Sequence, residues 1–269
     1  MKQTSMTAWI AGATVGLLLA GTASAAIKEE AVTYKDGDIV LKGFVVYDDT
    51  SAAKRPGIII VPTWWGINKH MHDEARMYAS EGYTAFIADM IGEGQSPDNP
   101  KEAGALMMHM RKSPAVMLSR FHAAKGVLSR QMTVDASRLG AAGYSVGGAF
   151  ALDAARAGSD LKGVAGFYVG MLPSALTAAD AGKITSRILI MNGGADPFIK
   201  SDVVDAFKKE MTDANVDLHY VSYPSARHSY TDPDATEKGK LFSIPFAYDA
   251  EATSQSRVET LKFFGEVFK

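Results

Sequence analysis

The chain has 269 residues, of which 47% are hydrophobic and 22% are charged, a mixture that can bury a core and excludes fibrous and disordered proteins. The formal net charge is −2, which provides no basic face for a phosphate backbone, so we expect no nucleic-acid partner. The chain contains no cysteine, and this excludes disulfides, cysteine-ligated zinc, iron–sulfur clusters and thiol catalysis.

The first 25 residues have the pattern of a secretory signal peptide. Lys2 precedes an uncharged apolar stretch over residues 8–21, and Ala23-Ser24-Ala25 supplies small residues at the spacing of a signal peptidase site. The apolar stretch is shorter than the roughly 20 residues of a bilayer span, so an uncleaved anchor is the weaker alternative. We expect cleavage after Ala25 and a periplasmic or secreted mature protein of 244 residues without membrane contact, whose net charge is −3 because one lysine is lost.

Residues 26–269 alternate short β-rich runs with amphipathic stretches, without a linker or an internal repeat, and we expect one domain. The predicted strands are residues 32–34, 39–47, 57–61, 83–88, 139–142, 164–169, 188–191 and 218–223, with a hairpin turn at residues 35–38. The predicted helices are residues 71–80, 103–110, 116–129, 147–157, 203–212 and 254–268.

This alternation predicts an α/β fold with a mostly parallel sheet and helices on both of its faces. The continuous apolar run at residues 57–61 is typical of a strand buried on both sides. Ligands of such sheets bind at the carboxyl ends of the strands, so reactive side chains are expected there.

Ser145 is the candidate nucleophile, in the motif Gly143-Tyr144-Ser145-Val146-Gly147. The motif follows a predicted strand and opens a predicted helix, which is the setting of a nucleophile elbow, where a sharp turn needs glycine beside the serine. A pentapeptide of this composition is weak evidence alone, since an ordinary glycine-rich turn also produces it. The strand–turn–helix setting favours the catalytic interpretation.

A serine needs a base and a group that orients the base. Asp196 directly follows the strand at residues 188–191, and His228 lies in the loop after the strand at residues 218–223. The order serine, aspartate, histidine is that of an α/β-hydrolase triad. The competing histidines lie at the start of a predicted helix or within predicted helices or strands; they are His70, His72, His109, His122 and His219. The competing acids do not directly follow a strand; they are Asp202, Asp232 and Asp234. We expect no metal site, because His70 and His72, two residues apart at the start of a predicted helix, point in different directions.

Acyl transfer also needs two backbone donors for the developing oxyanion. We expect these to be the amides of Val146, at the start of the helix, and Trp64, in the loop after residues 57–61, although Thr63 or Trp65 would serve in another register. Aromatic residues beside these positions are expected to line the substrate cleft, namely Trp65, Tyr144, Phe198 and Tyr230. The methionines between residues 107 and 117 are either core or a pocket roof.

Five segments together resemble the dienelactone hydrolase family of α/β-hydrolases. They are residues 62–68, 82–89, 143–149, 193–198 and 226–230, and they extend over nearly the whole mature chain. The resemblance implies an α/β-hydrolase fold and hydrolysis of a small ester or lactone without a cofactor or metal. Carried over by residue, it implies a triad of Ser145, Asp196 and His228, with Trp64 and Val146 as oxyanion donors.

Three differences from the family pattern modify that expectation. The namesake enzymes use a cysteine where this chain has Ser145, and a glutamate where it has Thr63. They also place an arginine shortly after the histidine, for the carboxylate of the lactone, where this chain has Asp232 in the run Ser229-Tyr230-Thr231-Asp232. An acidic residue there would repel an anionic substrate.

We therefore predict a serine carboxylesterase for small neutral esters or lactones. True dienelactone hydrolysis, and perhydrolysis or acyl transfer on the same triad, are the alternatives. A non-catalytic binding protein on this scaffold is disfavoured because binding does not require the three residues. The sequence leaves open a monomer or a homodimer.

Overall fold

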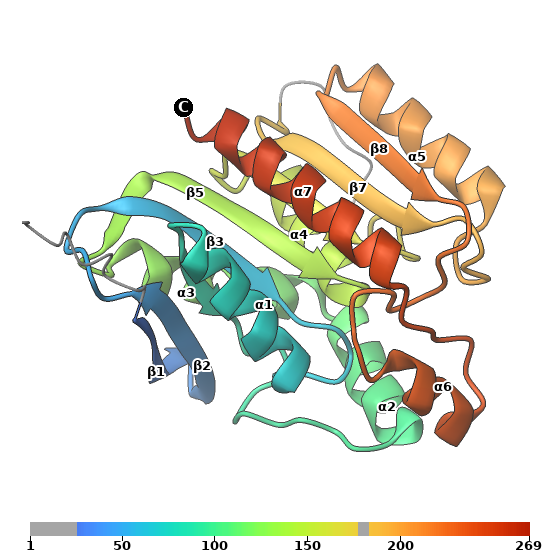
Figure 1. The fold of residues 1–269 in the computed structure, drawn as a ribbon, viewed down its shortest axis with the longest axis horizontal. Coiled ribbons are helices and arrows are strands. Elements are labelled where there is room, and N and C mark those ends of the chain that lie inside the picture. Colours follow the sequence, from blue (N-terminus) through green and yellow to red (C-terminus); the bar gives the residue numbers. More distant parts are fainter. Residues whose placement is uncertain (1–25, 177–182) are drawn as a thin grey trace, which may run out of the picture.

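The computed structural model describes residues 26–176 and 183–269, and the predicted signal peptide at residues 1–25 lies outside the described residues. The described chain forms an eight-stranded sheet in the order β1-β2-β4-β3-β5-β6-β7-β8 (Figure 1). Strands β3 to β8 run parallel, while β2 is antiparallel to both β1 and β4. The predicted α/β fold class and the mostly parallel sheet are confirmed.

All eight predicted strands are present. They are β1 (Ile27–Asp36), β2 (Ile39–Asp48), β3 (Arg55–Val61), β4 (Thr84–Ile87), β5 (Val134–Tyr144), β6 (Gly163–Phe167), β7 (Arg187–Gly193) and β8 (Leu218–Tyr223). The first two form a hairpin with a two-residue turn at Gly37 and Asp38, where Gly37 has a φ of 58° that suits glycine. Strand β1 is much longer than predicted, because its exposed residues hide the alternating pattern.

The six predicted helices are also present. They are α1 (Lys69–Ser80), α2 (Pro100–Arg111), α3 (Pro114–Ser129), α4 (Val146–Arg156), α5 (Ser201–Asp213) and α7 (Ala250–Val267). An additional short helix, α6 (Ala235–Phe242), was not predicted. It buries only Ala235 and Gly239, so the sequence contains no apolar periodicity that would indicate it. None of the helices in the described ranges has the length and apolarity of a bilayer span.

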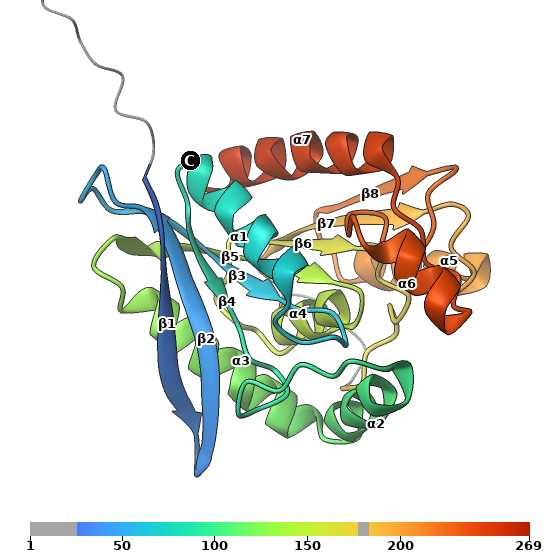
Figure 2. The ribbon, with the colours of Figure 1, turned by 60° about the horizontal axis from the view of Figure 1, so that its bottom comes forward.

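The helices form two layers around the sheet. Helices α1 and α7 cover one face, and α3, α4 and α5 cover the other, with a separate hydrophobic core under each layer (Figure 2). Helices α2 and α6 lie beyond the carboxyl ends of the strands, where a third small core contains Trp65, Ala103, Ala235 and Phe246. The carboxyl edge of the sheet is therefore walled by two helices that are not part of the strand–helix repeat.

Two glycines allow α4 to begin in contact with the sheet. A Cβ atom on Gly147 would lie 2.2 Å from the carbonyl oxygen of Val61 and 2.4 Å from that of Pro62. A Cβ atom on Gly143 would lie 2.5 Å from the carbonyl oxygen of Gly147. Real Cβ atoms do not approach oxygen so closely, so the turn between β5 and α4 needs glycine on both sides of residue 145.

We expect Gly147→Ala to lower the free energy of unfolding by about 3 kcal/mol, because the new methyl group meets backbone atoms that cannot rotate away. Urea denaturation of the variant and wild type measures the difference. Gly265→Ala, in α7, is the matched control, since a Cβ atom added there would meet nothing within 4 Å. Alanine there should leave the stability equal or raise it by up to about 1 kcal/mol. Equal midpoints for Gly147→Ala and wild type would contradict the steric argument.

Candidate active site

Ser145 occupies a backbone conformation that side chains rarely adopt, with φ 55° and ψ −119°. Its N–H donates to the carbonyl oxygen of Phe167 at 2.9 Å, and its own carbonyl oxygen accepts from Gly148 N–H at 3.0 Å. These bonds attach the turn to the end of β6 and to the first turn of α4. The strained position is therefore held from both sides, which is how such conformations persist in folded proteins.

The structure brings Ser145, His228 and Asp196 together in one hydrogen-bonded line. Ser145 Oγ lies 2.8 Å from His228 Nε2, and His228 Nδ1 lies 2.7 Å from Asp196 Oδ2. The other carboxylate oxygen, Asp196 Oδ1, accepts from the N–H of Phe198 at 2.9 Å. Asp196 is buried, and its two acceptor bonds fix the plane in which it meets the imidazole.

The loops of Asp196 and His228 are joined directly behind these side chains. The N–H of Ala195 donates to the carbonyl oxygen of Ala226 at 3.1 Å. The carbonyl oxygen of His228 accepts from Ala247 N–H at 3.2 Å, and that of Tyr230 accepts from Asp249 N–H at 3.0 Å and from Thr253 Oγ1 at 2.8 Å. The chain on both sides of His228 is thus tied to β7 and α7.

Ser145 and His228 open into a cavity of about 240 Å³. Its other walls are predominantly apolar. They come from α2 and from the segments that follow β3, β6, β7 and α6, and they are Trp64, Met107, Gly170, Met171, Phe198 and Phe246. None of these residues carries a charged side chain. The cavity therefore suits a small ligand with little charge.

Three aromatic rings enclose the imidazole of His228. The ring centroids of Phe198, Phe246 and Tyr168 lie 5.0, 5.0 and 5.2 Å from that of His228. Phe198 and Tyr168 present an edge-to-face arrangement, whereas Phe246 is tilted by 33°. These contacts leave the ring little freedom other than the position in which it reaches both Ser145 and Asp196.

The two predicted oxyanion donors lie beside Ser145. Val146 is the first residue of α4, where backbone N–H groups have no acceptor within the helix. Trp64 lines the cavity together with Ser145, and Trp64 and Val146 both line a smaller adjoining cavity. The hydroxyl of Thr63 accepts from Trp65 N–H at 3.3 Å, so it serves the turn that positions Trp64.

Of the four predicted pocket residues, the structure brings only Phe198 to the cavity. Tyr144 is fully buried and donates to Glu74 Oε2 at 2.9 Å, because adjacent residues at the end of a strand point to opposite sides. Burial raises the pKa of Tyr144 well above its usual value. The prediction that Tyr144 lines the cleft is wrong.

Trp65 and Tyr230 were also wrongly assigned to the pocket wall. Trp65 packs against Phe242 of α6 in the third core, with ring centroids 5.8 Å apart. Tyr230 is fully buried, and its hydroxyl donates to the carbonyl oxygen of Met191 in β7 at 3.2 Å. Both residues support the walls of the site from behind.

Sequence reasoning missed Gly170, Met171 and Phe246. Gly170 and Met171 follow the carboxyl end of β6, so the rule for parallel sheets could have indicated them. Phe246 reaches the site because its backbone forms an isolated bridge with His228, and no local signal predicts that return. In the described part of the chain, no group of three or more histidine, aspartate or glutamate side chains is arranged to hold a metal ion.

The parallel sheet, the strained serine between β5 and α4, and the acid and histidine on later strand ends define an α/β-hydrolase. The chain belongs to the dienelactone hydrolase family, whose family model matches residues 41–268. The resemblance noted from the sequence is confirmed, and the chain is a hydrolase by family membership.

Several relatives align with most of their own length. The crystal structure of the dienelactone hydrolase-like promiscuous phosphotriesterase P91, from metagenomic libraries, is similar with a TM-score of 0.85 and 32% identity, and the alignment covers 91% of this chain and all of that chain. An uncharacterized protein of Caenorhabditis elegans, K02A2.1, is 34% identical over 55% of this chain and 92% of its own. A Bradyrhizobium protein named a probable 2-oxo-3-(5-oxofuran-2-ylidene)propanoate lactonase is 29% identical over 65% of this chain and 73% of its own.

Proposed function

We propose that this protein is a serine hydrolase that cleaves small, neutral carboxylic esters or lactones through an acyl-enzyme. The observation that carries the proposal is the line of hydrogen bonds from Ser145 Oγ through the imidazole of His228 to Asp196, 2.8 and 2.7 Å long. The line opens into an apolar cavity of about 240 Å³, a volume that suits a short acyl chain or a small ring.

In the proposed reaction, Ser145 Oγ attacks the carbonyl carbon of the substrate while His228 Nε2 accepts the hydroxyl proton. Asp196 accepts the hydrogen bond of Nδ1–H, which leaves Nε2 with the lone pair that the step needs. The amides of Trp64 and Val146 donate to the oxyanion of the tetrahedral intermediate. The intermediate expels the alkoxide, which takes the proton from Nε2.

Water then completes the cycle. It attacks the acyl carbon and gives a proton to His228 Nε2, the second intermediate collapses, and Ser145 Oγ recovers the proton as the carboxylic acid leaves. With a lactone, the expelled alkoxide remains attached to the acyl group, and the same water step releases a hydroxy acid. No cofactor enters either half of this scheme.

The charge of the surrounding residues supports a neutral substrate. Arg227 has an exposed side chain and does not line the cavity. Arg111 contacts Met171 and lines a neighbouring cavity with Asp153. Asp232 is buried and forms an ion pair with Lys238 at 2.8 Å. A substrate carboxylate would therefore lose its hydration in the cavity without meeting a cationic partner there.

We expect a serine-directed fluorophosphonate to label the protein once, on Ser145, and to abolish its ester hydrolysis. Peptide mass spectrometry locates the adduct. Ser145→Ala should remove the label and lower kcat on nitrophenyl acetate by about 10³-fold or more, because the nucleophile is lost. The folded state of the variant is checked by its urea midpoint. A folded wild-type protein that gains no label on Ser145 would contradict the proposal.

Two nitrophenyl esters that differ in charge test whether the cavity favours a neutral substrate. We expect kcat/KM for nitrophenyl butyrate to exceed that for the nitrophenyl hemiester of succinate by at least about tenfold, since burying an unpaired carboxylate is costly. A dienelactone, which carries a carboxylate, should be a poor substrate for the same reason. If the dienelactone has the higher kcat/KM, true dienelactone hydrolysis replaces the esterase assignment.

We further propose export with removal of the first 25 residues, on the sequence pattern described above. The full-length chain expressed with an intact secretion system should yield a mature protein that begins at Ala26. Intact-mass measurement and N-terminal sequencing of the periplasmic and culture fractions check the cleavage site. A full-length chain confined to the cytosol would overturn this part of the proposal.

A further inference from the structure

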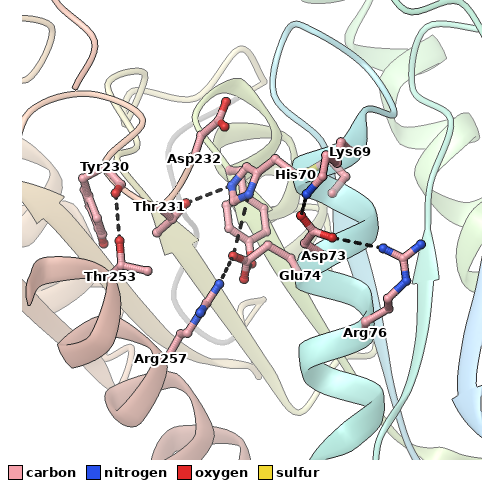
Figure 3. Close-up of polar contacts among 12 residues, drawn as sticks. Lys69, His70, Asp73, Glu74, Arg76, Tyr230, Thr231, Asp232, Thr253 and Arg257 are labelled. Atoms are coloured by element: carbon pink, nitrogen blue, oxygen red, sulfur yellow. Dashed lines mark hydrogen bonds and ion pairs between the residues drawn. The ribbon is translucent and has the colours of Figure 1, made fainter. Parts of the chain in front are cut away.

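Behind the candidate site, helix α1 contributes two buried polar side chains to a network that the proposed reaction does not use. His70 and Glu74 are 5% and 1% exposed, and they lie one helical turn apart, facing Arg257 of α7 and the loop that follows His228 (Figure 3). Thr231, in that loop, is 1% exposed. None of these side chains lines the cavity, so the network requires an explanation other than substrate contact.

Glu74 is the charged centre of the network. Its Oε1 accepts from Arg257 Nη2 at 2.9 Å, and its Oε2 accepts from the hydroxyl of Tyr144 at 2.9 Å. Burial of a carboxylate is costly unless it is paired and hydrogen-bonded, and both conditions are met here. Since Tyr144 immediately precedes Ser145, α1 and α7 together hold the end of β5 on which the serine stands.

His70 connects the same helix to the histidine loop. Its Nε2 lies 3.0 Å from Thr231 Oγ1, and its Nδ1 lies 3.8 Å from Glu74 Oε1. Burial lowers the pKa of His70 below its usual value, even though Glu74 and Asp232 oppose that shift. A neutral ring with its proton on Nδ1, toward the carboxylate, would leave Nε2 to accept the hydrogen bond of the Thr231 hydroxyl.

The hydroxyl of Thr231 has a second partner, Tyr168. Tyr168 Oη lies 3.0 Å from Thr231 Oγ1, and burial raises the pKa of Tyr168 well above its usual value, so the phenol stays protonated. The rings of Tyr168 and His228 also pack edge to face, with 5.2 Å between their centroids. A line of hydrogen bonds therefore runs from Tyr168 through Thr231 to His70, on the helix that also carries Glu74.

We propose that Thr231 is a positioning residue for His228. Its hydroxyl joins α1 to the loop that carries the imidazole and to the tyrosine that packs against the imidazole. The backbone bonds of that loop lead to β7 and α7, whereas the Thr231 hydroxyl ties it to the helix that also supports β5. Through it, the position of His228 is coupled to that of Ser145. The expected effect on kcat rests on the proposed function, whereas the effect on the position of His228 does not.

The kinetic test uses a matched pair at one position. Thr231→Val keeps the shape and removes the hydroxyl, and Thr231→Ser keeps the hydroxyl. We expect Thr231→Val to lower kcat on nitrophenyl acetate by about 10- to 100-fold with KM within about twofold of wild type, because a displaced base slows proton transfer without affecting the apolar walls. Thr231→Ser should restore kcat to within about threefold of wild type. Tyr168→Phe, which keeps the ring, should lower kcat in the same direction.

Thr84→Val controls for loss of a buried hydroxyl. Thr84 Oγ1 pairs with Thr133 Oγ1 at 3.1 Å, and Thr84 begins β4, at the opposite end of the sheet from the site. It should lower the thermal midpoint by about as much as Thr231→Val and leave kcat unchanged. A parallel loss of kcat in Thr84→Val, or an unchanged kcat in Thr231→Val, would overturn the positioning role.

A second readout does not depend on turnover. The proton between His228 Nδ1 and Asp196 is followed by NMR as a downfield resonance that is assigned by its loss in Asp196→Ala. We expect this resonance to broaden in Thr231→Val and to remain sharp in Thr231→Ser and Thr84→Val. If wild type hydrolyses no ester and Thr231→Val still broadens the signal, the proposed function fails and the positioning role stands. An unchanged signal in an active enzyme overturns the positioning role alone.

Discussion

The conformation of Ser145, with φ 55° and ψ −119°, is the constraint on which the arrangement of the site depends. An L-residue remains there only when the surrounding structure determines its position more than once. The bond from Ser145 N–H to Phe167 attaches it to β6, and the contact of Gly147 with the carbonyls of Val61 and Pro62 attaches the following helix to β3. Three strand ends therefore fix the direction of Oγ. The loop that carries Trp64 begins at Pro62. The contact between Gly147 and this part of the chain therefore positions both Ser145 and the candidate oxyanion donors.

Residues on the two sides of this turn have opposite environments. Ser145 faces an apolar cavity, while Tyr144 faces a buried carboxylate paired with Arg257. A low-polarity cavity strengthens the few hydrogen bonds that are made within it, including the one between Ser145 and His228. Glu74 and Arg257 lie behind the strand ends and pair with each other there. The candidate nucleophile and the buried ion pair thus lie on opposite sides of the end of β5.

The sequence predicted the fold, because buried parallel strands and amphipathic helices are indicated by local patterns that the tertiary structure did not override. It also led to Ser145, Asp196 and His228, since strand ends of a parallel sheet converge at one edge and chain order selected among the histidines. The pocket walls were less predictable. Tyr144 and Tyr230 adjoin the candidate residues along the chain, but their side chains point away from them. Phe246 is distant along the chain and comes back through a bridge to His228. Helix α6, which turns the chain for that return, is too short and too polar to produce a signal.

The segment that contains α6 extends from the buried pair Thr231 and Asp232 to Asp249, and the bond between Asp249 N–H and Tyr230 O closes its base at 3.0 Å. A loop closed at its base can change in length at little cost in chain entropy, because that cost grows only slowly with the number of residues. Phe246, near the end of this segment, lines the cavity, whereas Ser145, Asp196 and the candidate oxyanion amides lie at strand ends and at the start of α4. A change in the length of this loop can therefore alter which acyl groups the cavity accommodates without moving the strand ends and the helix start that hold Ser145 and Asp196.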